Sequence, residues 1–357
     1  MALSPQPEEE IARARNELRM GVPIAFEAGG ETVLVAAVET LRPDRWEAFQ
    51  ALDAPVLAVT ARRAETLRAR AYDGDLARIA VPEGTPVVWL QSVADPAADL
   101  ASPMKGPFET LRGGKARVER AALVLARRAL LLPAVVTTSV DAAPAGVQVF
   151  DLERVEALIS SWSAFTQVSS ARVPTALAGA GRVTVFRSAD GAEEHYAVEV
   201  GMPDRAVPVL SRLHSACFTG DVLGSLKCDC GPQLHAALEA IAKTGAGVLL
   251  YLNQEGRGIG LANKMRAYAL QDQGFDTVEA NHRLGFEDDE RNLRVGAELL
   301  RVMGISSVRL MTNNPRKVEM MRAGGVDVVE RVPLSVGQTA ENRAYLATKR
   351  DRSGHLL

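Results

Sequence analysis

The three cysteines of this 357-residue chain all lie between positions 217 and 230, at Cys217, Cys228 and Cys230. Cys228 and Cys230 are too close for a relaxed disulfide, and any pair would leave one cysteine over. Three thiolates that converge on one point suit Zn²⁺ with one open tetrahedral position, which is typical of a catalytic zinc. His214 could supply a fourth ligand and make the site structural. The alternative is three reduced cysteines in a core.

The composition places the chain among ordinary globular proteins. Hydrophobic residues make up 47% and charged residues 24%, and the length predicts two domains or three small ones. The net charge of −3 does not show the basic character that is typical of nucleic-acid-binding proteins. The start MALSPQPEEE has no basic or apolar signal region, and the apolar run 121–140 is interrupted by arginines. We therefore expect no membrane span and a location in the reducing cytoplasm, where clustered thiols indicate metal binding or catalysis.

Alternating helix and strand patterns fill residues 1–150 and predict an α/β domain. Residues 151–165 read as a connecting helix, and residues 172–180, with Pro174, as a linker. The second half, 181–357, predicts another α/β domain, so the expected fold class is two α/β domains with mixed sheets flanked by helices. The expected strands include 22–26, 32–38, 56–60, 86–90, 134–138, 181–187, 195–200, 207–213, 247–252, 308–311 and 326–332, and the expected helices include 8–20, 62–71, 116–131, 232–243, 261–273 and 287–303.

Several segments of the second half could carry chemistry or could be structural. The turn QEGRGIG, from Gln254 to Gly260, follows a strand and precedes a helix, so it suits a phosphate or a nucleobase but also plain packing. Asn314 before Pro315 is typical of a helix cap. The charge run from Asp288 to Arg291 is typical of a helix start, although a carboxylate there could act as a general base. Tyr268 could equally be an ordinary core residue. His282 could be a ligand or a polar residue whose hydrogen bonds are satisfied within the protein.

Taken together, the motifs RLHSACFTGD, SLKCDCG, QEGRGIGLANKMRAYALQDQG, DTVEANHRLGF and TNNPRKV resemble GTP cyclohydrolase II, the entry enzyme of riboflavin synthesis. The resemblance covers about residues 172–357, including the terminal Gly354 to Leu357. It implies that Cys217, Cys228 and Cys230 hold one Zn²⁺ per chain. It also implies a homodimer with GTP as its small-molecule substrate and no nucleic-acid or membrane partner.

The resemblance implies roles for further residues. Asp289 matches the family's proton acceptor, Arg291 its assigned nucleophile toward the α-phosphate, and Tyr268 its active-site tyrosine. Since a guanidinium stays protonated in water, electrostatic stabilisation is an easier task for Arg291. Glu255 is implied to read the guanine edge. The implied GTP-binding set is Arg212, Leu213, His214, Ser215, Ala216, Gln233, Glu255, Gly256, Arg257, Thr277, Thr312 and Lys317.

The implied reaction converts GTP and water to 2,5-diamino-6-ribosylamino-4(3H)-pyrimidinone 5′-phosphate, formate and pyrophosphate, with Mg²⁺ for pyrophosphate release. Two positions depart from the family pattern: Ala216 stands where a relative often carries Glu, and Asn253 where Arg is common. These departures bear on substrate contacts rather than on the reaction. The alternatives are a paralogue in another pathway such as pyrimidine catabolism, an enzyme that stops at the formamide, and a non-catalytic nucleotide-binding regulator.

Residues 1–150 resemble a distant 3,4-dihydroxy-2-butanone-4-phosphate synthase domain. That family binds Mg²⁺ through an acidic loop after its first strand, and here the corresponding stretch is Glu27 to Thr32, EAGGET. Its H-T-E-A motif is replaced by Arg117-Val118-Glu119-Arg120. A site built from oxygen ligands does not survive that loss. We therefore expect a degenerate domain without synthase activity.

Overall fold

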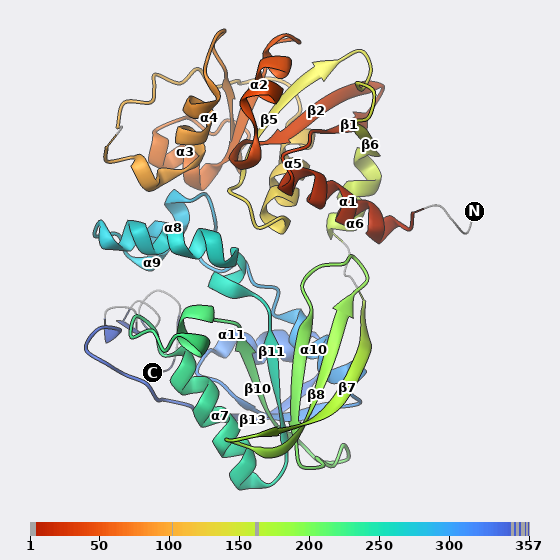
Figure 1. The fold of residues 1–357 in the computed structure, drawn as a ribbon, viewed down its shortest axis with the longest axis vertical. Helices are drawn as coiled ribbons and strands as arrows, with labels where there is room; N and C mark the ends of the chain where they lie inside the picture. The colour runs from red at the N-terminus through yellow and green to blue at the C-terminus, as the bar shows by residue number, and fades with distance from the viewer. Residues whose placement is uncertain are drawn as a thin grey trace. The chain divides into compact units, whose positions relative to one another are not determined.

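The computed structural model describes residues 5–101, 103–160 and 164–343, together with residues 346, 347, 350, 354 and 356. The chain forms two compact units (Figure 1). The first unit contains residues 1–162 and 262–290, and the second contains residues 163–261 and 291–357. Within the described residues, no helix is long and apolar enough to cross a membrane. The expected features at the extreme ends, including His355 and Leu357, lie outside the described residues.

The first unit is built on a six-stranded sheet of order β4-β3-β5-β2-β1-β6. Four of its five strand pairings are antiparallel, and only β1 and β6 run parallel. The strands β1 and β2 are joined by a two-residue turn at Gly29 and Gly30, whose positive φ angles of 59° and 87° suit glycine. The strands are β1 (Ile24–Ala28), β2 (Glu31–Ala37), β3 (Val56–Thr60), β4 (Leu76–Ala80), β5 (Ala134–Val140) and β6 (Gln148–Asp151).

Helices α1 (Pro7–Arg19), α5 (Arg117–Arg128) and α6 (Leu152–Ser160) pack together and cover the core of this sheet (Figure 1). The apolar residues of α5 recur with a helical period, so one face of it is buried. The amino-terminal half also contains α2 (Pro43–Gln50), α3 (Ala61–Leu67) and α4 (Val87–Ala94). The strand expected over residues 86–90 is wrong, because Pro86 precedes α4 and the buried Val87, Leu90 and Val93 follow a helical period.

The second unit has a seven-stranded mixed sheet of order β13-β12-β10-β11-β9-β8-β7. Its strands β10, β11, β12 and β13 pair in parallel, whereas β7, β8 and β9 pair antiparallel. The two mixed sheets confirm the predicted α/β class. The strands are β7 (Phe165–Thr175), β8 (Gly179–Ser188), β9 (His195–Val200), β10 (Val209–Ser215), β11 (Gly247–Leu252), β12 (Ser307–Met311) and β13 (Asp327–Val332).

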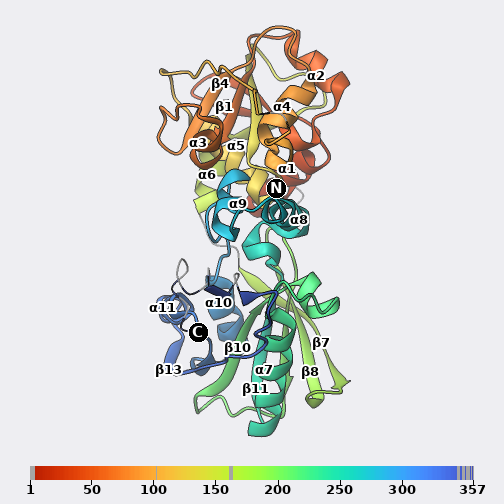
Figure 2. The same ribbon diagram turned by 90° about the vertical axis from the view of Figure 1, so that its left-hand side faces the viewer.

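Both faces of the parallel strands β10 and β11 are buried. Leu210 and Leu249 pack with α7 (Cys230–Thr244), whereas Leu213 and Leu250 pack with α10 (Arg294–Val302) and α11 (Pro315–Ala323). Figure 2 shows α7 running along the strands. This two-sided burial explains the near-continuous apolar run of β11, whereas β10 also buries the polar Ser211, Arg212 and His214.

The segment from Ala262 to Glu290 leaves the second unit after β11 and belongs to the first unit. It contains α8 (Gly260–Asp272), which begins just before the boundary, and α9 (Thr277–Arg283). In Figure 1, α9 lies beside α3 of the same unit, and the two helices are in contact. Sequence patterns gave no sign that this segment folds with the amino-terminal half.

Two further expectations differ from the structure. Residues 172–180 form the end of β7, a turn and the start of β8 rather than a linker, and Pro174 is tolerated because β7 is an edge strand. The helix expected from residue 287 begins only at Arg294, because the preceding residues form a turn region. Asn314 does cap α11, since its side chain accepts a hydrogen bond from the Arg316 N–H.

Candidate metal centre and nucleotide site

The three cysteines meet directly after β10. Cys217 precedes a π-helical turn over Phe218–Val222, and Cys230 is the first residue of α7. The three sulfur atoms lie within 4.8 Å of one another, and the Cys217 and Cys228 sulfurs are 3.7 Å apart. Cys217 and Cys228 are buried, and none of the three forms a disulfide. Among the described residues, this is the one cluster of three or more such side chains that could hold a metal ion.

Gly220 shows that the space around the sulfurs is shaped for them. A Cβ atom on this residue would lie 2.8 Å from the Cys228 sulfur and 3.1 Å from the Cys217 sulfur. The 2.8 Å distance is shorter than real Cβ contacts, so a side chain at this position would force the thiols to shift. A soft donor set of three thiols in a tight cradle fits Zn²⁺. Cys217, Cys228 and Cys230 therefore fit the predicted ligand set.

The carboxylate of Asp221 organises the neighbourhood of Cys217. It accepts hydrogen bonds from the Cys217 N–H at 3.0 Å, from the Tyr251 hydroxyl at 2.9 Å and from His214 Nε2 at 3.0 Å. Burial lowers the pKa of His214, which keeps the imidazole neutral. His214 also stacks on the Tyr251 ring. His214 is not among the side chains whose ligand atoms cluster with the three sulfurs.

Arg212 lies at the same edge of the sheet and is deeply buried. Its guanidinium donates to the carbonyl of Met311 at 2.9 Å and to the side-chain oxygen of Gln233. Burial lowers the pKa of Arg212 to about 10, so it still carries its charge at neutral pH. Its Nε atom has no hydrogen-bond partner in the described part of the chain. Such an unsatisfied buried donor is the kind of group that a ligand oxygen would complete.

The turn after β11 carries Glu255. One carboxylate oxygen accepts from the Phe218 N–H at 2.6 Å, and the other accepts from the Gly256 N–H at 2.9 Å. Phe218 follows Cys217 directly, so the structure brings the predicted base-reading residue to the thiol window. Gly256 and Arg257 both have a φ of 62°, which is costly for Arg257. Strain of this kind gathers at functional sites.

Two further cations converge on the end of β10. The ammonium of the buried Lys317 donates to the Leu213 carbonyl at 2.8 Å, and Arg291 donates to the Ser215 hydroxyl at 3.2 Å. The buried Thr312 hydroxyl accepts from the Asn314 N–H at 3.0 Å, which shapes the turn before α11. Three cations, counting Arg212, therefore lie around one strand end. The arrangement can bind an anion such as a phosphate group.

The position of this site follows from the topology. Cys217, Glu255 and Thr312 each come within three residues of the end of a parallel strand, at the carboxyl ends of β10, β11 and β12. The chain passes from β10 to β11 on one side and later returns to β12 on the other side of β10. Ligands of open α/β sheets bind at the carboxyl edge where the strand order reverses in this way. Leu213 and Ala216 are buried beneath the edge as part of its support.

The remaining predicted residues lie in the first unit. Tyr268 is on α8, with the Lys264 ammonium 5.6 Å from its ring centre. Thr277 begins α9, and its hydroxyl accepts from the Gln271 amide at 3.4 Å. Asp289 lies in the turn region that follows α9, next to Asp288, which contacts His282 at 2.7 Å. Their roles stay predictions.

Sequence reasoning missed Gly220, Asp221 and Tyr251. Gly220 and Asp221 stand in the motif RLHSACFTGD, between the first and second cysteines, so the motif held the signal. Tyr251 lies on a neighbouring strand and has no sequence signal of its own. Only the parallel register, which pairs Tyr251 with His214, brings it to the cluster.

Comparison with known proteins agrees with this geometry. The profile of the GTP cyclohydrolase II family matches residues 166–333. A GTP cyclohydrolase-2 from Cronobacter sakazakii is 53% identical over 191 residues, which cover 54% of this chain and 96% of that protein. A solved two-domain 3,4-dihydroxy-2-butanone 4-phosphate synthase from A. baumannii aligns at 16% identity and a TM-score of 0.31, over 91% of this chain and 99% of that one. That structural likeness is too loose to support a conclusion.

A GTP cyclohydrolase-2 from Azospirillum brasilense is 43% identical over 371 aligned residues, which cover 97% of this chain and 94% of that protein. Identity at this level over nearly the full length of both proteins includes the amino-terminal half as well as the thiol site. The chain therefore belongs to the GTP cyclohydrolase II family.

Proposed function

We propose that this chain is a zinc-dependent GTP cyclohydrolase II that converts GTP and water to 2,5-diamino-6-ribosylamino-4(3H)-pyrimidinone 5′-phosphate, formate and pyrophosphate. One observation carries the proposal. Three thiols around Gly220 lie at the carboxyl edge of parallel strands, and Glu255 accepts a hydrogen bond from Phe218, the residue after Cys217. Family membership supports the substrate, GTP, and a place in riboflavin synthesis.

Cys217, Cys228 and Cys230 would hold one Zn²⁺ per chain. When bound, the ion supplies a Lewis acid that lowers the pKa of water. Asp221 anchors the Cys217 backbone and orients His214 and Tyr251 beside it. Such outer partners hold ligands in place.

Glu255 would accept from guanine N1–H and the 2-amino group through the remaining lone pairs of a carboxylate that the Phe218 and Gly256 N–H groups hold in place. Arg212, Lys317 and Arg291 would bind the phosphates, with Arg291 stabilising charge during pyrophosphate release. We assign Mg²⁺ to that step. The sequence resemblance assigns proton transfer to Asp289, a catalytic role to Tyr268 and a nucleotide contact to Thr277.

The test is product analysis by mass spectrometry after incubation with GTP, Zn²⁺ and Mg²⁺. The pyrimidinone phosphate with equimolar formate and pyrophosphate is the expected result. Accumulation of a formamide would show an enzyme that stops after ring opening. Unchanged GTP, bound but not converted, would show a regulator, and turnover of a different base would show a paralogue of another pathway.

Residues 1–150 are proposed to form a synthase-like domain without synthase activity, followed by a connecting region at 151–180 and the cyclohydrolase domain at 181–357. The tight β1–β2 hairpin supports this, because Ala28 and Glu31 already face each other and leave only Gly29 and Gly30 between the strands. No acidic metal-binding loop fits there. The full-length protein should make no dihydroxybutanone phosphate from ribulose 5-phosphate with Mg²⁺.

We further propose a homodimer that works in the cytoplasm. The three free thiols support a reducing compartment. Gel filtration with light scattering tests the dimer.

A further inference from the structure

The segment 262–290 carries three residues with proposed roles, and the amino-terminal half holds it at both ends. Within the first unit, α8 and the turn region after α9 make hydrogen bonds and ion pairs with residues of positions 39–132. Tyr268 lies in α8, and Asp289 lies in the turn region. The contacts therefore flank the residues to which the proposed function assigns catalysis.

The first group of contacts centres on Arg266, two residues before Tyr268. Its guanidinium pairs with Asp95 at 3.1 Å and with Glu39 at 3.1 Å, and it donates to Asn263 at 2.7 Å. Asn263 is completely buried and donates to the Leu130 carbonyl at 3.0 Å. A guanidinium held from three directions loses its rotational freedom. One turn of α8 is thereby fixed to the amino-terminal half.

The second group lies before Asp289. The Gly285 carbonyl accepts from the buried Thr60 hydroxyl at 2.8 Å. Gly285 has a φ of +88°, and a Cβ there would lie 2.9 Å from Thr60 and 2.9 Å from Pro133, so the close approach requires glycine. Two residues on, Glu287 accepts a bidentate pair of bonds from Arg62, the shortest at 2.8 Å. The backbone that leads to Asp289 is thus held at two successive points.

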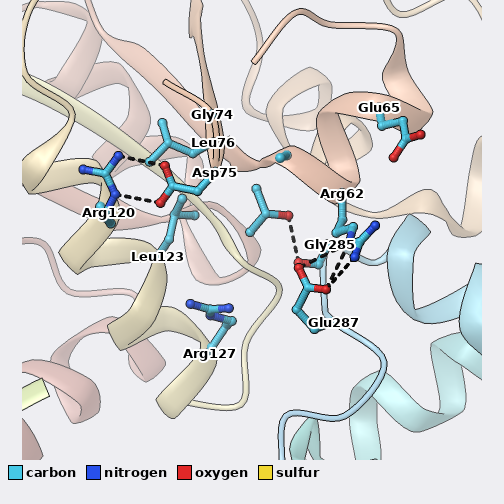
Figure 3. Close-up of a pocket in the computed structure, with 12 residues that line it drawn as sticks. Arg62, Glu65, Gly74, Asp75, Leu76, Arg120, Leu123, Arg127, Gly285 and Glu287 are labelled. Atoms are coloured by element: carbon cyan, nitrogen blue, oxygen red, sulfur yellow. Dashed lines mark hydrogen bonds and ion pairs between the residues drawn. The ribbon is translucent and has the colours of Figure 1, made fainter. Parts of the chain in front are cut away.

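The cavity beside this contact has about 330 Å³ of space, and its walls are shown in Figure 3. Its lining includes three arginines, Arg62, Arg120 and Arg127, and three carboxylates, Glu65, Asp75 and Glu287. Four of these six groups already form two bidentate pairs, Arg62 with Glu287 and Arg120 with Asp75. A lining with balanced, paired charges does not favour an ionic ligand. We explain the cavity as the edge of the contact between the segment 262–290 and the amino-terminal half, which we call the docking contact.

We propose that Glu39, Asp95, Thr60 and Arg62 of the amino-terminal half are positioning residues for the cyclohydrolase reaction, acting through the segment 262–290. This inference rests on the proposed function of Tyr268 and Asp289. On this inference, the synthase-like domain serves to position the segment 262–290 and needs no substrate of its own. A misplacement of about 1 Å at a reacting group can cost on the order of 100-fold in rate, so such contacts matter for kcat more than for binding.

The test uses the full-length enzyme with two variants, the double change Glu39→Gln/Asp95→Asn and the single change Arg62→Glu. The expected result is a fall in kcat for formate release of about 10- to 100-fold with little change in KM for GTP. Hydrogen exchange of the backbone amides in 262–290 should become faster in both variants. The second change Glu287→Arg, added to Arg62→Glu, should restore both values because it rebuilds the pair with reversed charges.

Asp75→Asn is the matched control. The Arg120–Asp75 pair has similar exposure to the Arg62–Glu287 pair and lies in the wall of the same cavity, but it joins two parts of the amino-terminal half (Figure 3). It should leave kcat and the exchange of 262–290 unchanged. Equal kcat in wild type, Arg62→Glu and the double variant would overturn the inference, as would an equal loss in Asp75→Asn. If wild type releases no formate from GTP, the proposed function fails, and unchanged exchange in both variants would then overturn the docking contact separately.

Discussion

The two sheets of this protein place polar groups very differently. In the second unit, thiols, cations and Glu255 gather at the carboxyl ends of parallel strands. In the first unit, most strand pairings are antiparallel, and the charged groups form separate pairs such as Arg78 with Asp73 and Arg120 with Asp75. Parallel strands require long crossovers, so their ends leave room for functional loops, whereas a hairpin leaves only a turn. The difference in topology explains why, within the described part of the chain, the candidate metal centre lies at the second sheet.

Glu119 shows most clearly how the polar groups of the first unit differ from those of the second. It is buried on α5 of the first unit, and its Oε2 has no hydrogen-bond partner within the described residues. Burial raises the pKa of Glu119. A single buried carboxylate with a raised pKa is a poor basis for a cation site, whereas the three clustered thiols of the second unit offer three donors to one ion.

The largest effect should come from Cys228→Ser. Removing one of three ligands should lower zinc affinity by more than the about 10- to 100-fold that loss of an outer partner costs, and formate release should be lost with the metal. Metal analysis of the purified variant and a formate assay measure both. Val222→Ala, an exposed change in the same window, is the control and should keep its zinc. Full zinc in Cys228→Ser would show that the ligand set is wrong.

The next effect concerns base selection by Glu255. Adenine offers no N1–H or 2-amino donor, so the Glu255 carboxylate would lose both of the bonds that guanine gives it, and ATP should be rejected by on the order of 1,000-fold. Glu255→Gln should bind GTP much more weakly, measured by calorimetry. A variant with unchanged GTP affinity that still rejects ATP would mean that another group reads the base. The same comparison with Glu65→Gln in the first unit should show no change.

A smaller effect is expected from His195, which supports the second sheet. Burial lowers its pKa to about 4, while an unfolded chain binds that proton near the ordinary histidine pKa of about 6.5. Stability is therefore fully present above about pH 6.5 and falls toward pH 4, by up to about 1.4 kcal/mol per pH unit. His195→Asn keeps an acceptor for the Asn253 N–H and should flatten this slope. Urea unfolding at pH 7.5, 6 and 5 measures how the free energy of unfolding changes with pH. The same pH dependence in wild type and His195→Asn would contradict the assignment of this effect to His195.

The smallest effect is expected at Glu119. Because burial raises its pKa, the folded state favours the neutral acid, so stability is lost as pH rises through the ordinary carboxyl pKa and beyond. Glu119→Gln should therefore leave stability at pH 7.5 unchanged or raise it by on the order of 1 kcal/mol. Thermal unfolding measures this change. A clear loss of stability would show that the charge of Glu119 stabilises the first unit. The two sheets would then differ less in how they use buried polar groups.

The sequence by itself determined most of the elements and the residue types that meet at the candidate site. The apolar periods located most strands and helices, and the clustered cysteines with the Gln-Glu-Gly-Arg turn identified the residues that meet at the edge of the second sheet. These features are local, because a period, a cap such as Asn314 or a short spacing between ligands depends on neighbouring residues.

The tertiary structure alone decided three matters. It brought Asp221, Tyr251 and His214 together, since strand register is not written in any one segment. It placed His214 against Asp221 and outside the group of clustered thiols. It also placed residues 262–290 with the amino-terminal half, through contacts such as Thr60 with Gly285 that span more than 200 positions. Such pairings arise from packing over long separations, and no local pattern encodes them.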